Sequence, residues 1–221
     1  MSALRVYAQE QSVGRSAEGA WVALRATRDG SPIVVPWYQA LGLEGRVFQA
    51  ASAVGADATL TLVTVAALAD TVATIAADIP DGTACIPFEA DFTFRATGAA
   101  IDIYQLFMAQ AVNGVAGTET AITPRNLRGD NNIATAATAM HTASGEADNV
   151  DGTEIVLQLF STSQDLDATG IDPERHWSVV KAGFAPVLWD ACSFNLIAAA
   201  TTSGTGQGFL TWCELPESAF N

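Results

Sequence analysis

The sequence contains a single lysine, Lys181, and its 10 basic residues stand against 24 acidic ones. The net charge of −14 argues against nucleic acid and membranes as partners, because both need many Lys and Arg side chains. No apolar run approaches the ~18 residues that span a bilayer. The first residues, MSALRVYAQEQS, lack a basic start before an apolar run, so we expect no signal peptide.

Residues that carry chemistry are also scarce. The motifs GxGxxG, GxSxG, HExxH and the phosphate-binding loop are absent. Three cysteines, Cys85, Cys192 and Cys213, lack CxxC spacing, which argues against a disulfide framework or a zinc site and favours a reducing compartment. We therefore expect no enzyme. A hydrolase that uses His141 or His176 with a nearby carboxylate is the lesser alternative.

One acidic segment, DLDATGID, has part of the spacing of a calcium loop. Asp165, Asp167 and Gly170 occupy positions one, three and six of such a loop, and Asp172 follows. Position twelve, which needs a glutamate, holds His176. We expect an acidic surface turn and no cofactor. Calcium bound by Asp165, Asp167 and Asp172 is the alternative.

Alternation of apolar and polar residues is the main pattern that is present. From Ala84 to Phe94, every second residue of ACIPFEADFTF is alanine, isoleucine or phenylalanine, which predicts a strand with one buried face. Cys85 then falls on the polar face. Pro87 has no N–H for a ladder, so it predicts either an edge strand or a bulge. The preceding Pro-Asp-Gly-Thr, residues 80–83, predicts the turn of a hairpin.

Similar patterns predict an all-β protein, an antiparallel sandwich of two sheets. Residues 113–151, rich in Gly, Thr, Ala and Asn, interrupt it as one long excursion, with a short helix at 132–142. Residues 65–78 favour a strand over a helix. We divide the chain into an N-terminal arm with first strands, 1–57, and a sandwich, 58–221, which belong to one domain. The strands are expected at residues 21–28, 33–37, 45–51, 58–65, 101–110, 152–160, 176–189, 192–200 and 208–216.

Three segments resemble parts of structural proteins from tailed bacteriophage virions: DIPDGTACIP (78–87), ITPRNLRGDN (122–131) and GFLTWCELPE (208–217). The resemblance covers about residues 58–221. It implies a jelly-roll-like sandwich that assembles as a trimer and coats or decorates a capsid, or forms part of a fibre. The major capsid protein is then an expected partner, and the virion, assembled in the host cytoplasm, the expected location. Residues before about 50 lie outside the resemblance and are interpreted as an arm that reaches a neighbouring subunit.

The strands at 101–110 and 152–160 carry large apolar residues on both faces, and we expect both to lie inside a sheet. One face of each needs a cover beyond the sandwich core, and a second copy of the chain is the expected cover. A carbohydrate-binding module that stacks sugars on the five tryptophans is the alternative function. The interface candidates are Ile101, Ile103, Tyr104, Phe107, Val156 and Phe160.

Overall fold

The computed structural model describes only part of the chain, and the statements below concern that part alone. The described residues are 36–52, 60–61, 63–64, 73–97, 102–112, 120–129, 133–141, 154–162, 174–200 and 204–217. For residues 60–61, 63–64, 95–97, 102–103, 160–162, 200 and 204 the backbone is described without the side chain. The predicted strand at 21–28 lies outside these residues.

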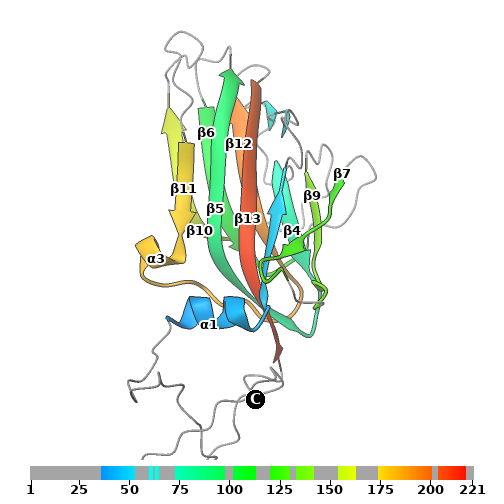
Figure 1. Ribbon diagram of the computed structural model, residues 1–221. Coiled ribbons are helices and arrows are strands. Elements are labelled where there is room, and N and C mark those ends of the chain that lie inside the picture. Colours follow the sequence, from blue (N-terminus) through cyan, green and yellow to red (C-terminus); the bar gives the residue numbers. More distant parts are fainter. Residues whose placement is uncertain are drawn as a thin grey trace, which may run out of the picture.

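Two sheets form the body of the protein (Figure 1). The first contains, in spatial order, β11 (Glu174–Ser178), β5 (Thr83–Thr97), β13 (Gly204–Pro216), β1 (Val47–Ala51) and β8 (Arg125–Asn126), with β2 (Leu60–Thr61) on β13. The second contains β10 (Glu154–Thr162), β6 (Asp102–Ala109), β12 (Cys192–Ala200), β4 (Ile75–Ile79), β9 (Thr138–His141) and β7 (Thr120–Ile122), with β3 (Val63–Thr64) on β12. All pairs are antiparallel except β3 with β12.

The strand order is that of a jelly roll. In the first sheet β1, β13, β5 and β11 are neighbours, and in the second β4, β12, β6 and β10 are neighbours. The first and last of these strands, β1 and β13, lie side by side, and the chain changes sheet at most connections, as in two Greek keys. The expected fold class is confirmed. Two helices, α1 (Trp37–Leu43) and α3 (Val179–Ala182), lie at one end of the first sheet (Figure 1).

The main core lies between the two sheets, where every second side chain of each strand points inward. Both sheets contribute aromatic and branched aliphatic residues to this core. Each fully buried large apolar side chain stabilises the fold by ~1.5–3 kcal/mol. The largest fully buried members of the core are Trp212, Tyr104, Phe48, Phe92, Phe94, Phe194, Ile75, Ile79, Leu106 and Met108.

A bulge in β5 shifts the alternation of inward-facing and outward-facing side chains along this strand. Glu89 pairs with Thr211 and Pro87 with Trp212, so Phe88 is an extra residue between them. Since the alternation shifts there, Ala90, Phe92 and Phe94 face the core, but Phe88 and Ile86 lie on the outer face.

The bulge corrects two predictions. Cys85 is buried in the main core, so its predicted place on a polar face was wrong. β5 lies between β11 and β13, so the edge strand was wrong, and the alternative of a bulge is confirmed at Phe88, next to Pro87.

The Pro-Asp-Gly turn is present, but it does not close a hairpin. Gly82 has a positive φ of 82°, and its N–H donates to the Asp81 carboxylate at 3.0 Å. The strands on either side, β4 and β5, belong to different sheets. The turn therefore carries the chain across the sandwich.

Other expectations fail where local pattern and tertiary position disagree. The excursion holds the strand β9 in place of the expected helix, and its short strands extend both sheets. The strand expected at 176–189 ends at Ser178, whose hydroxyl caps α3 by accepting from Lys181 N–H at 3.4 Å. The strand expected at 33–37 is replaced at its described end by α1, which begins after Pro36.

The prediction of a strand in residues 65–78 is confirmed at the described end of that segment, which forms β4.

In the described residues, no helix has the length and apolar character needed to cross a membrane.

Candidate functional site

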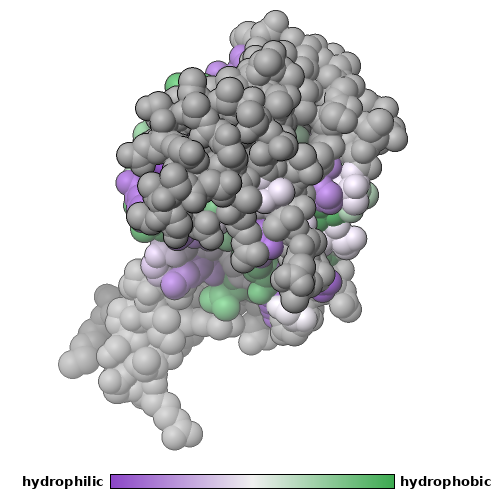
Figure 2. Space-filling model, turned by 90° about the horizontal axis from the view of Figure 1, so that it is seen from above, coloured by the Kyte–Doolittle hydropathy of each residue, from purple (hydrophilic) through white to green (hydrophobic). Residues whose placement is uncertain are grey.

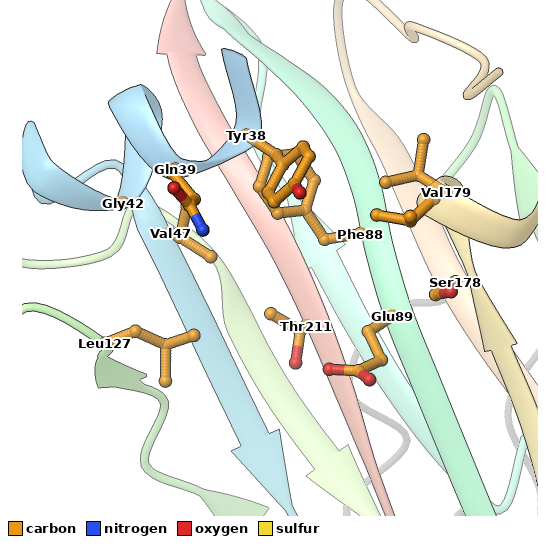
Figure 3. Close-up of a pocket in the computed structure, with 11 residues that line it drawn as sticks. Tyr38, Gln39, Gly42, Val47, Phe88, Glu89, Leu127, Ser178, Val179 and Thr211 are labelled. Carbon is orange, nitrogen blue, oxygen red and sulfur yellow. The ribbon is translucent and has the colours of Figure 1, made fainter. Parts of the chain in front are cut away.

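A groove lies on the outer face of the first sheet, near the two helices. Its volume is about 320 Å³, and its floor is formed by Val47, Phe88 and Thr211 of three adjacent strands. Figure 3 shows Leu127 and Val179 on opposite sides of it, with Gln39 and Tyr38 descending from α1. The groove exists because α1 packs Tyr38 and Leu41 on a small outer cluster of Val47, Ile86, Phe88 and Cys213.

One side of the groove carries a carboxylate. Glu89 lines this side, and the two ring nitrogens of His176 lie 3.7 Å from Glu89 Oε1 and 3.5 Å from Asp91 Oδ2. His176 stands directly opposite Asp91 in the β11–β5 ladder, where cross-strand pairs of this kind add modest stability. Burial, and then the nearby Glu174, raise the pKa of Asp91 above its usual range, while His176 opposes this shift.

The two histidines lie in different sheets. His141 ends β9 in the second sheet, and burial lowers its pKa. His176 belongs to β11 in the first sheet and contacts carboxylates on both sides. These positions do not bring the histidines into one site.

A buried carboxylate, Glu214, fastens the excursion to β13. Its side chain accepts hydrogen bonds from Trp212 Nε1 at 2.8 Å, from Ala136 N at 2.7 Å, and from the Thr135 hydroxyl. Ala137 N approaches its Oε1 at 3.4 Å. A charge buried at 5% exposure needs such donors, and these donors come mainly from residues 135–137. Glu214 is thus a structural residue, which the sequence pattern TWCELP did not reveal.

Three carboxylates, from the β4–β5 turn, the segment before β12 and the residue after β13, lie close together. Oxygen atoms of Asp81, Asp190 and Glu217 lie within 4.8 Å of one another, an arrangement that a hard cation could bind. Asp190 N–H also donates to Glu217 at 2.8 Å. Sequence reasoning missed this cluster, because its members come from three distant segments. The predicted calcium ligands Asp165, Asp167 and Asp172 lie outside the described residues.

The predicted interface residues differ from one another in exposure. Tyr104 is fully buried in the main core, and Phe107 is 2% exposed in a second cluster with Ala109, Ile197 and Ala199. These two side chains are therefore already covered within one chain. Val156 is 51% exposed, as an interface residue requires. Ile101 lies outside the described residues, and the side chains of Ile103 and Phe160 are not described.

Among the described side chains of the second sheet, the exposed large apolar ones belong to β10. This strand pairs with β6 and occupies the outermost position of its sheet, so its expected interior position was wrong. Beside Val156 it exposes Leu159 at 67% and Ile155 at 41%. Sequence reasoning missed these two residues because alternation does not distinguish an edge strand from an interior one.

No family model matches the chain, and no curated protein matches it. Among solved structures, VP2 of infectious bursal disease virus, from a crystal structure of the subviral particle, is similar at 15% identity over 80% of this chain and 43% of that chain. The chain thus spans less than half the length of that protein. The TM-score of 0.18 supports no conclusion about fold or function, so the jelly roll is established by the strand order.

Proposed function

We propose that the chain is a non-enzymatic structural protein of a virion, which self-assembles and coats or decorates a phage capsid or forms part of a fibre. The observation that carries the proposal is the apolar β10. In the described part of the chain it is the outermost strand of its sheet, with Ile155, Val156 and Leu159 exposed. An apolar edge of this kind is a template for pairing with another chain, and a jelly roll is an architecture that capsid domains use.

The charge of the protein supports apolar contacts as the basis of assembly. Copies that each carry a net charge of −14 repel one another, and salt screens this repulsion. Contacts through Ile155, Val156 and Leu159 gain from burial without opposing charge. Assembly should therefore strengthen as salt is raised.

Electron microscopy of the purified protein, alone and with any particle that co-purifies, tests the proposal. Wild-type protein should form ordered oligomers or add density to the particle, and Leu159→Asp should do neither. Thr120→Asp is the matched control, because Thr120 is an exposed residue of β7 at the opposite edge of the same sheet. A wild-type protein that stays dispersed at high salt and binds no particle would refute the proposal.

A carbohydrate-binding role is the second candidate. Trp37 is 50% exposed and Trp189 is 38% exposed, whereas Trp177 and Trp212 are buried. Two exposed indoles can stack on sugar rings. Titrating glycans against the tryptophan fluorescence of wild type, Trp37→Ala and Trp189→Ala separates the two roles, because a structural protein gives no saturable change.

A further inference from the structure

The groove between α1 and α3 has the chemistry of a site for an apolar segment with one basic residue. Tyr38, Val47, Phe88, Leu127 and Val179 supply apolar surface. Among the described residues that line the groove, Glu89 is the only charged one. Its side chain is 41% exposed, so a cation can reach it beside His176, whose Nε2 lies 3.7 Å from Glu89 Oε1. Val180, which also lines the groove, is 62% exposed, and Trp37, 50% exposed, packs edge-on against the ring of Phe88.

The chain itself contains a segment of this composition. Residues 1–35 hold four of the 10 basic residues and three of the 24 acidic ones, so the segment is net positive. The rest of the chain holds six basic and 21 acidic residues, a net charge of −15. The two parts are therefore complementary in charge.

Within this segment, WVALRATR (21–28) has the required pattern. In an extended conformation Val22, Leu24, Ala26 and Arg28 share one face, because side chains alternate along a strand. That face offers three apolar side chains and then one guanidinium. Arg25 falls on the other face.

The position of the segment along the chain also fits. Pro36 precedes α1, and Tyr38, Gln39 and Gly42 of α1 line the groove. An extended chain spans ~3.3 Å per residue, so the residues between Arg28 and Pro36 reach about 26 Å. A tether this short gives a millimolar effective concentration at the groove.

We propose that residues 22–28 dock in this groove of the same chain, with Val22, Leu24 and Ala26 on its apolar walls and Arg28 against Glu89. The docked segment covers the outer face of β5 and β13 near α1 and neutralises Glu89. This contact is independent of the virion role, since it needs no second copy and no particle.

Hydrogen exchange on the full-length protein tests the docking. The exchange rates of the backbone amides of residues 22–28 should be lower than those of an unstructured chain by a factor of about ten or more. Glu89→Arg and Arg28→Glu should each remove this protection, and the double variant should restore it by reversing the pair. Arg25→Glu is the matched control and should keep the protection. Free exchange in the wild type, or no rescue in the double variant, overturns the proposal.

Disulfide trapping identifies which chain occupies the groove. Ala26→Cys combined with Val180→Cys should form a cross-link within one chain, seen as a fast-migrating 23.0 kDa band on a non-reducing gel. The three native cysteines are buried and should not compete. A cross-linked dimer would mean that a second copy donates the segment, and that result contradicts docking within one chain.

Discussion

The indole N–H of Trp212 donates a hydrogen bond of 2.8 Å to the carboxylate of Glu214, two residues further along β13. The same carboxylate accepts from Ala136 N at 2.7 Å. One buried charge therefore joins the last strand of the jelly roll to the excursion between β6 and β10.

Replacing Glu214 should destabilise the protein more than replacing other acidic residues. Glu214→Ala leaves the Trp212 indole and the Ala136 N–H without their acceptor, at about 1–3 kcal/mol for each buried unpaired group. Glu154→Gln, at the start of β10, is the control and should stay within about 0.5 kcal/mol of wild type. The measurement is urea unfolding followed by tryptophan fluorescence. Equal midpoints for the two variants would contradict the structural role of Glu214.

Gly208 should not tolerate a side chain. A Cβ built there lies 2.4 Å from the backbone oxygen of Asp91 and 2.6 Å from the ring of Phe92. Because the strands would have to separate, Gly208→Ala should cost about 1–3 kcal/mol. Gly129→Ala is the control, since a Cβ at Gly129 meets nothing within 4 Å. Thermal unfolding of the two variants should differ clearly, and a Gly208→Ala protein as stable as the control would show that the close approach is wrong.

The sandwich itself could be predicted because alternation is a local property. The run from Ala90 to Phe94 faces the core as expected. The bulge at Phe88 depends on pairing with β13, so the reversed positions of Cys85 and Ile86 could not be read from alternation alone. Likewise, the Gly82 turn was predictable from its residues, but which sheet each flanking strand joins is set by distant partners.

The candidate site was less predictable for the same reason. The groove combines α1, α3 and residues of β1, β5, β11 and β13, and the carboxylates of Asp81, Asp190 and Glu217 meet only through the fold. The sequence placed the apolar surface on residues 101–110 and 152–160. Burial of Tyr104 and Phe107 removes two of the candidates on the first, and the edge position of β10 exposes the second.

Stability should fall in mildly acidic solution, in part because of His141. Burial lowers the pKa of His141 below its usual 6.5 in the folded state, so the unfolded chain binds the proton more readily. The stabilisation from neutral His141 is complete above pH 6.5 and is lost as the pH falls through the lowered pKa. His141→Gln should lose less stability than wild type between pH 7 and pH 5. Parallel curves of unfolding free energy against pH would contradict this.

The three cysteines should remain free thiols of low reactivity. Cys85, Cys192 and Cys213 are buried, and burial raises the pKa of Cys85 and of Cys213, which disfavours the reactive thiolate. Thiol reagent should label the native protein slowly and label all three residues in denaturant. Mass evidence for a disulfide between Cys192 and Cys213 would refute the prediction.

Light scattering at micromolar concentration tests self-assembly most directly. Wild-type protein should have a mass several times 23.0 kDa, with a trimer expected from the resemblance to phage virion proteins, and Leu159→Asp should reduce it. Raising the salt concentration should increase the mass of the wild type, because it screens the net charge of −14. A wild-type mass of 23.0 kDa at both low and high salt would contradict assembly through β10.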